Sequence, residues 1–265
     1  MITFDTLMSE AKDRGMPGGK TRGILREYLQ VLSLKELYKT PAGKSLYFTG
    51  GTYLRLAHGT KRFSEDLDFN AVKLSRTTFE DSILSTAKTL LREGFTVSAE
   101  FNHRGKLLIG ELIFPDAESK YSIVSKYSKK EGIVLKVEAN LPEWRVTPET
   151  LLVSGFGQML PVFCTQKSAL FADKIDALVK KNRSRHLYDI IFMLSKKYPI
   201  DTKILKSFGI VKDPFTTIMD RVNSFSPAEL KKQAEELRPF LFDEGEAELL
   251  VNAKTIIPQL IEKYT

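Results

Sequence analysis

Apolar side chains recur at two different spacings along this chain, and the change of spacing separates helices from strands. The apolar positions Ile24, Tyr28, Val31, Leu32 and Leu34 follow the helical spacing and predict an amphipathic helix that ends near Thr40-Pro41. The short apolar segment SLYFTG predicts a buried strand, and Gly50-Gly51 predicts a tight turn before TYLRLAHG resumes a helical pattern. The segment DLDFNAV alternates acidic and apolar side chains, which predicts a half-buried strand, and a helix follows from about Thr77 to Arg92.

Residues 94–140 have the period of strands. The segments FTVSAEF, KLLIGELIF and GIVLKVEANL are separated by the polar breaks HRG and SKKEG, and we expect antiparallel neighbours joined by hairpins. The chain still looks extended through Val162, and after TQKS it turns helical. Four helical patterns follow: ALFADKIDALVKK, HLYDIIFMLSKK, PAELKKQAEELRPFL and EAELLVNAKTIIPQLIEK. Strands followed by helices predict an α+β protein, with an α/β core over residues 1–160 and a helical lobe over residues 161–265.

Composition narrows the class of protein. The 265 residues, 42% hydrophobic and 28% charged, suffice for one large domain or two modest ones and exclude disorder, collagen and coiled coil. The 40 basic and 33 acidic side chains give a net charge of +7, which favours a polyanionic partner. The single cysteine, Cys164, excludes an internal disulfide and a zinc site built on several thiolates, so we expect a buried thiol. No apolar stretch approaches the length of a membrane span, and the acidic first segment is unlike a signal peptide, so we expect a cytoplasmic protein without a membrane partner.

The acidic pair of DLDFNAV is the first candidate for chemistry. On a strand, Asp66 and Asp68 project from one face, while Leu67 and Phe69 turn the other way into the core. Two carboxylates this close are costly unless a cation neutralises them, so the spacing suits a divalent metal that also carries phosphates. The alternative is an acidic pair on a solvated surface.

The turn before this strand supplies a candidate phosphate site. Gly50 and Gly51 permit close approach to the backbone, and the following helix offers unpaired N–H groups at its N-terminus. Thr52 can cap that helix or bind phosphate, and the alternative is that the glycines mark only a turn. The order of glycine pair, helix and acid pair places a phosphate cradle beside metal-binding carboxylates.

The string FTGGTYLRLAHGTKRFSEDLDF resembles the AbiEii/AbiGii toxin family of the nucleotidyltransferase superfamily. That superfamily shares a Gly-Gly or Gly-Ser turn, a short helix, an acid-x-acid strand and a third acid on a later strand. In GIVLKVEANL, Lys136 and Glu138 lie on one strand face, where a lysine can meet phosphate and a carboxylate can complete a metal site. Glu138 resembles the family's third acid; the alternative is an exposed face of an amphipathic strand.

The segment TQKSALFADKIDALVKKNRSRHLYDIIFML is similar to a second family signature, in which K-x-x-A-L leads to an arginine and then to R-D-x-x-D. The positions that fit it are Lys174, Ala177, Leu178, Arg183 or Arg185, and Asp189. His186 stands where the family usually has the aspartate of Arg-Asp. A break between helices separates Lys174 from Arg185, so both can hold nucleotide phosphates. The alternative is pairing with neighbouring acids, namely Asp173, Asp176 or Asp189.

Other residue types point to no competing chemistry. The three histidines are scattered without metal-ligand spacing, and Gly-x-Ser-x-Gly is absent. Arg55 and Arg62 are candidates for contact with a nucleotide or RNA, or for a surface position.

The resemblance implies a metal-dependent nucleotidyltransferase toxin with a nucleotidyltransferase-like mixed sheet, flanking helices and a C-terminal helical lobe that completes the nucleotide and acceptor cleft. The toxin would transfer a nucleotide from an NTP to a hydroxyl, with the 3′ end of tRNA as the expected acceptor, and a cognate antitoxin would neutralise it. The expected catalytic residues are Asp66, Asp68, Glu138 and Lys174, of which the three acids bind Mg²⁺ or Mn²⁺. The expected nucleotide-binding residues are Gly50, Gly51, Thr52, Arg55, Lys136, Arg185 and Asp189. The alternatives are a non-catalytic nucleotide- or RNA-binding regulatory module on the same fold, and an interaction protein whose basic lobe binds RNA or protein.

Overall fold

The computed structural model describes residues 1–123 and 132–264, and the chain divides into two compact units. The first unit comprises Met1–Gly59 and Phe63–Thr165, and the second comprises Thr60–Arg62 and Gln166–Thr265. The chain therefore leaves the first unit for three residues between the glycine turn and the acid pair. Most of the expected polar break SKKEG, residues 128–131, lies outside the described residues.

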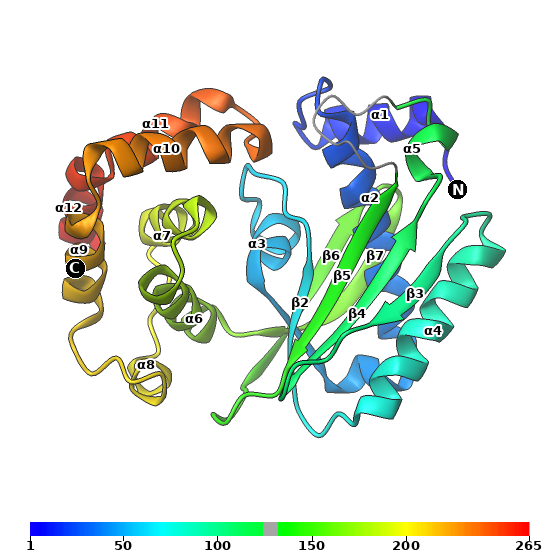
Figure 1. Cartoon of the computed structure of the whole chain (residues 1–265), viewed down its shortest axis with the longest axis horizontal. Coiled ribbons are helices and arrows are strands. Elements are labelled where there is room, and N and C mark those ends of the chain that lie inside the picture. Colours follow the sequence, from blue (N-terminus) through cyan, green and yellow to red (C-terminus); the bar gives the residue numbers. More distant parts are fainter. Residues whose placement is uncertain (124–131, 265) are drawn as a thin grey trace. The chain divides into compact units, whose positions relative to one another are not determined.

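A seven-stranded mixed sheet forms the centre of the first unit, with the strand order β3-β4-β5-β2-β1-β7-β6 (Figure 1). The strands are β1 (Leu46–Thr49), β2 (Leu67–Ala71), β3 (Ser98–Phe101), β4 (Leu107–Phe114), β5 (Ile133–Asn140), β6 (Pro148–Gly155) and β7 (Gln158–Thr165). Strand β2 pairs antiparallel with β1 and parallel with β5. The expected antiparallel pairing of the segments between residues 94 and 140 is confirmed by β3–β4 and β4–β5. Strand β7 continues through residue 160, where the sequence pattern placed the end of the core.

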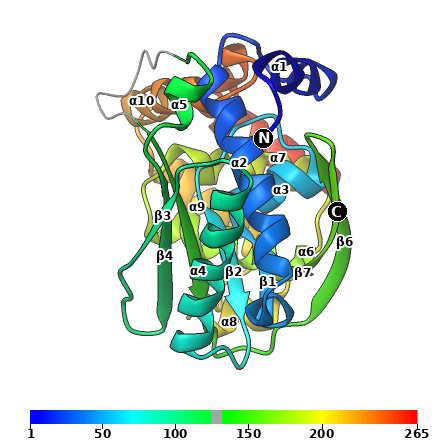
Figure 2. The same ribbon diagram turned by 90° about the vertical axis from the view of Figure 1, so that its right-hand side faces the viewer.

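Helices cover one face of this sheet, and Figure 2 shows α2 and α4 lying side by side along it. The helices of the unit are α1 (Phe4–Asp13), α2 (Thr21–Tyr38), α3 (Gly50–His58), α4 (Arg76–Arg92) and α5 (Ala117–Lys120). Leu67 and Phe69 of β2 and Val137 of β5 are buried, as the alternation predicts. Helix α1 was not expected, because only Leu7 and Ala11 of its ten residues are buried and the amphipathic signal is short.

The second unit consists of helices. They are α6 (Lys167–Lys180), α7 (Ser184–Ser195), α8 (Thr202–Ser207), α9 (Pro214–Ser224), α10 (Pro227–Leu237), α11 (Glu248–Val251) and α12 (Ala253–Tyr264). The predicted helix over 227–241 ends at Leu237, and a 3₁₀ turn follows because Pro239 cannot continue an α-helical ladder. The predicted last helix is also divided, into a 3₁₀ turn, α11 and α12. Helix α9 was not expected; Asp213 caps it by accepting from the Thr216 N–H, and Pro214 occupies its first position.

These elements confirm the α+β class and the mixed sheet with flanking helices. None of the helices over the described residues is both long enough and apolar enough to cross a membrane.

Candidate functional site

Asp68 lies where β1, β2 and α3 meet. The register of β1 and β2 sets Asp68 opposite Thr49, and α3 begins at the next residue, Gly50. Gly50 has a φ of +78°, and a Cβ atom at this position would lie 2.8 Å from the Cβ of Asp68 and collide with its carboxylate. The backbone of the turn therefore lies directly against the second acid of the pair, as the order of the motifs predicts.

This close approach makes Gly50 sensitive to substitution. We expect Gly50→Ala to lower the free energy of unfolding by about 2–3 kcal/mol, because it combines the cost of a left-handed backbone with a collision against Asp68. Gly59→Ala is the matched control, since Gly59 has a φ of +75° and open space around the added methyl group. It should cost only about 1 kcal/mol. Urea denaturation of both variants measures the difference, and equal losses would show that the contact with Asp68 is unimportant.

The residue that precedes α3 has a buried hydroxyl group without a partner among the described residues. Thr49 is the residue before α3, and it is 7% exposed. Its Oγ1 is buried and has no hydrogen-bond partner in the described parts of the chain. The Thr49 side chain makes no capping hydrogen bond to α3, so this hydroxyl and the helix N-terminus are suited to a phosphate oxygen.

The neighbouring strand β5 brings a third acid to the same face. Its parallel register with β2 sets Glu138 beside Asp68, and the alternation of β5 confirms that Lys136 and Glu138 share a face. The Lys136 Nζ lies 3.2 Å from Glu138 Oε1. Burial alone would lower the pKa of Lys136, but the carboxylates of Asp66, Glu138 and Glu111 raise it above its usual value. The positively charged side chain of Lys136 therefore lies near three carboxylates.

The donor set suits a metal that is completed by a substrate. No group of three or more His, Cys, Asp or Glu side chains in residues 1–123 and 132–264 is arranged to hold a metal ion. Asp66 and Asp68 are hard oxygen donors, and Asp68 lies against the Gly50 turn. Mg²⁺ commonly binds one or two carboxylates and takes its other ligands from water and phosphates. The residues thus fit an ion shared with phosphate, and a site with Glu138 as third ligand stays a prediction.

Two residues of α3 contact the rest of the first unit. Thr52 lies within the first turn rather than at the cap, and its fully buried hydroxyl donates to the backbone carbonyl of Asp66. Arg55 is buried rather than on the surface, and its Nε donates to Glu27 Oε2 at 2.9 Å. Phosphate binding by Thr52 and nucleotide binding by Arg55 stay predictions, while these contacts support the position of α3.

In the second unit, Asp189 is paired with two cations. Its carboxylate accepts from Arg62 Nε and Nη2 at 2.8 and 2.7 Å and from Lys174 Nζ at 2.7 Å. All three side chains are buried, so the surface position considered for Arg62 is wrong. Burial would raise the pKa of Asp189, but Arg62 and Lys174 outweigh it and hold this pKa well below its usual range. Lys174 therefore makes the acid pairing that the sequence left as the alternative to phosphate binding.

The predicted break between helices separates α6 from α7, with Lys174 inside α6 and Arg185 in the first turn of α7. Arg185 is half-buried. The next residue, His186, is 8% exposed, and neither ring nitrogen has a hydrogen-bond partner within the described residues. Burial and the neighbouring charges of Lys174, Arg185 and Lys181 lower the pKa of His186 to about 3.

A neutral buried histidine makes stability depend on pH. The folded-state pKa of His186 lies below its unfolded value of 6.5, so the unfolded chain binds more protons and stability falls as the pH drops below 6.5. We expect the free energy of unfolding at pH 5, relative to pH 7, to fall by about 2 kcal/mol more in the wild type than in His186→Asn. Urea denaturation at the two pH values measures this, and identical pH profiles would contradict it.

The family model described as "Nucleotidyl transferase AbiEii toxin, Type IV TA system" matches residues 33–250. The chain belongs to the AbiEii family. Among curated protein sequences, none matches the chain.

Solved structures resemble this AbiEii family member in fold. MenT4, a nucleotidyltransferase toxin from Mycobacterium tuberculosis H37Rv, is 17% identical with a TM-score of 0.59, over 99% of this chain and 90% of that one. A candidate nucleotidyltransferase from Helicobacter pylori is 18% identical with a TM-score of 0.59, over 92% and 96% of the two chains. JHP933 from the same species is 17% identical with a TM-score of 0.54, over 92% and 93%. At identities of 17% and 18%, the similarity to these solved structures supports the fold alone. The match to the AbiEii family model supports nucleotidyltransferase activity.

Two residues that lie near the candidate site of this AbiEii family member were not predicted from the sequence. Glu111 lies opposite Lys136 in the β4–β5 register, and nothing in KLLIGELIF distinguishes it without that register. Thr49 precedes the glycine pair, and a hydroxyl residue at a helix N-cap position was an available signal.

Proposed function

We propose that this chain is a metal-dependent nucleotidyltransferase toxin that transfers a nucleotide from an NTP to the 3′-hydroxyl group of tRNA and is neutralised by a cognate antitoxin. The observation that carries the proposal is the junction at Asp68, where the glycine turn lies against this carboxylate and Glu138 lies beside it on the adjacent strand. The net charge of +7 is compatible with an RNA acceptor.

The first unit supplies the groups that this reaction needs. Asp66 and Asp68 would hold Mg²⁺ or Mn²⁺, which when bound neutralises phosphate charge and orients the triphosphate. Thr49 and the N–H groups that follow Gly50 would receive phosphate oxygens, and Lys136 would balance their charge.

In the chemical step, the acceptor hydroxyl oxygen forms a bond to the α-phosphorus. The bond from the α-phosphorus to the oxygen bridging it to the β-phosphate breaks, and pyrophosphate leaves with that electron pair. The carboxylate of Glu138 would accept the hydroxyl proton, and its neighbour Lys136 would stabilise the carboxylate before the transfer. In the second unit, the contacts of Lys174 and Asp189 favour a supporting role, and phosphate binding by Arg185 stays a prediction.

An incorporation assay tests this proposal. The purified protein is incubated with total tRNA, Mg²⁺ or Mn²⁺, and each NTP labelled in turn at the α-phosphate. We expect label from at least one NTP to enter tRNA, no transfer from the same NTP labelled at the γ-phosphate, and only background with Asp66→Asn/Asp68→Asn. Expression should arrest growth in a manner lost with the double variant and relieved by the antitoxin.

Other outcomes separate the alternatives. NTP binding without incorporation into RNA or protein would support the non-catalytic module. Salt-sensitive RNA binding that the double variant retains, without any incorporation by the wild type, would support the interaction protein.

A further inference from the structure

The first acid of the pair lies outside the sheet. Strand β2 begins at Leu67, so Asp66 lies one residue before the strand, and the preceding residues Phe63–Glu65 have no regular secondary structure. The expectation that both acids belong to the strand is therefore wrong for Asp66. Because Asp66 is not part of a strand, contacts other than strand pairing must set the direction of its carboxylate.

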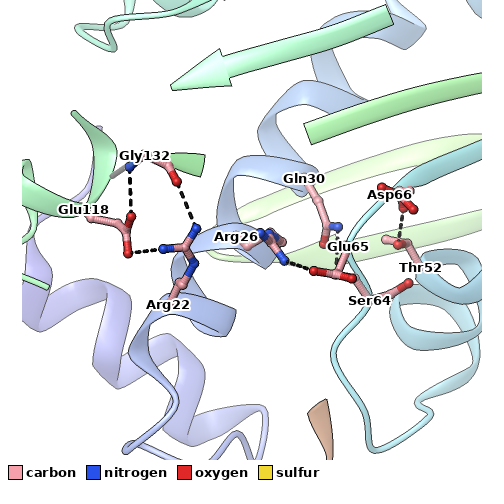
Figure 3. Close-up of polar contacts among 9 residues, drawn as sticks. All are labelled: Arg22, Arg26, Gln30, Thr52, Ser64, Glu65, Asp66, Glu118 and Gly132. Atoms are coloured by element: carbon pink, nitrogen blue, oxygen red, sulfur yellow. Dashed lines mark hydrogen bonds and ion pairs between the residues drawn. The ribbon is translucent and has the colours of Figure 1, made fainter. Parts of the chain in front are cut away.

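Side chains from two helices hold this irregular segment. Gln30 of α2 is 1% exposed, and its Nε2 donates to the carbonyl of Ser64 at 3.0 Å. Thr52 of α3 is completely buried and donates its hydroxyl to the carbonyl of Asp66. Figure 3 shows Gln30 reaching the segment from one side and Thr52 from the other.

A third contact holds the residue between Ser64 and Asp66 in the sequence. Arg26 precedes Gln30 by one helical turn, and its Nη1 lies 2.7 Å from Glu65 Oε1. The three residues Ser64, Glu65 and Asp66 are thus each held by a side chain from outside the segment. Two of the three contacts are made to backbone carbonyls, which orient the chain itself.

We propose that Gln30 and Thr52 are positioning residues for the metal-binding carboxylate of Asp66, with Arg26 as a further support. This inference rests on the proposed function, in which Asp66 binds the ion. Hydrogen bonds behind a metal ligand fix its orientation, and their loss typically lowers metal affinity about 10–100-fold. Arg26 and Gln30 precede residue 33, where the match to the family model begins.

The same helix offers a matched control. Arg22 lies one turn before Arg26, and it also bonds to a glutamate and to a backbone carbonyl. Its partners are Glu118 and Gly132, at 2.7 and 2.9 Å, so it holds a different part of the first unit. Loss of Arg22 tests the general effect of removing a hydrogen-bonded side chain from this helix.

The experiment measures Mn²⁺ binding to the full-length protein, without nucleotide or RNA, by titration calorimetry and by electron paramagnetic resonance. We expect Thr52→Val, which keeps the shape but loses the hydroxyl, to raise the Kd for Mn²⁺ about 10-fold. Thr52→Ser keeps the hydroxyl and should bind within about 2-fold of the wild type. Gln30→Met should behave like Thr52→Val, whereas Arg22→Gln should leave the Kd within about 2-fold even if its Tm falls.

Each other result counts against the proposal. An unchanged Kd in Thr52→Val, with binding still weakened by Asp66→Asn, would overturn this inference and leave the proposed function standing. Equal weakening in Thr52→Val and Arg22→Gln would also overturn it, because the effect would then be a general loss of structure. Mn²⁺ binding that Asp66→Asn does not weaken would overturn the metal site of the proposed function and this inference with it. If Gln30→Met does not fold, the serine and valine variants at Thr52 decide the question.

Discussion

Asp189→Ala is expected to lower the free energy of unfolding of the second unit by about 3–5 kcal/mol. Asp189 is completely buried and is the shared acceptor of Arg62 and Lys174, whose side chains are only 2% and 7% exposed. The substitution leaves the positive charges of Arg62 and Lys174 buried without their carboxylate partner. This costs far more free energy than the intact ion pairs contribute. Denaturation followed by the fluorescence of tyrosine and by circular dichroism measures the change.

A surface ion pair of the same unit provides the control. Asp220 of α9 pairs with Lys212, and both side chains are more than half exposed. Asp220→Ala should therefore change the free energy of unfolding by no more than about 1 kcal/mol, because water already solvates both charges. If the two aspartate variants were equally stable, the buried cluster would have no special role in the unit.

This cluster also shows why some of the fold was predictable from the sequence and some was not. The strand, glycine turn and helix over residues 46–58 follow from local spacing, and the structure places all three there. The bond between Arg62 and Asp189 spans 127 positions, so no local pattern indicates it. The same sequence motif that suggested phosphate contact at Lys174 and Asp189 thus holds a buried structural contact.

The candidate site was also predictable from the sequence only in part. Alternation predicted that Lys136 and Glu138 share a face, and that Leu67 and Phe69 are buried. The position of Glu138 beside Asp68 depends on a parallel pairing of strands 70 residues apart, which the family resemblance suggested and the periodicity alone did not. Which strands pair depends on contacts between segments that are far apart in the sequence. Such contacts produce no periodic pattern of side chains within either segment.

The strongest loss of activity is expected from Asp68→Asn, which should lower nucleotidyl transfer at least about 10³-fold. Asp68 is one of the two proposed ion-binding carboxylates, and the metal supplies several kcal/mol of transition-state stabilisation. Since each 1.36 kcal/mol corresponds to a factor of ten in rate, losing about 4 kcal/mol accounts for this factor. Initial rates of α-labelled NTP incorporation into tRNA, at saturating Mn²⁺, measure it.

Glu138→Gln separates the two roles open to the third acid. If Glu138 is a general base, it would contribute about 10²–10⁴-fold to kcat, and its loss would leave the Mn²⁺ concentration for half-maximal rate unchanged. We expect this result, because Lys136 Nζ lies 3.2 Å from Glu138 Oε1 and already provides this carboxylate with a cation. Glu111→Gln is the matched control, since Glu111 lies on the same face opposite Lys136, and kcat should stay within about 3-fold. A higher Mn²⁺ requirement in Glu138→Gln than in Glu111→Gln would instead make Glu138 the third metal ligand, because the loss of a nearby charge weakens ion binding in both variants.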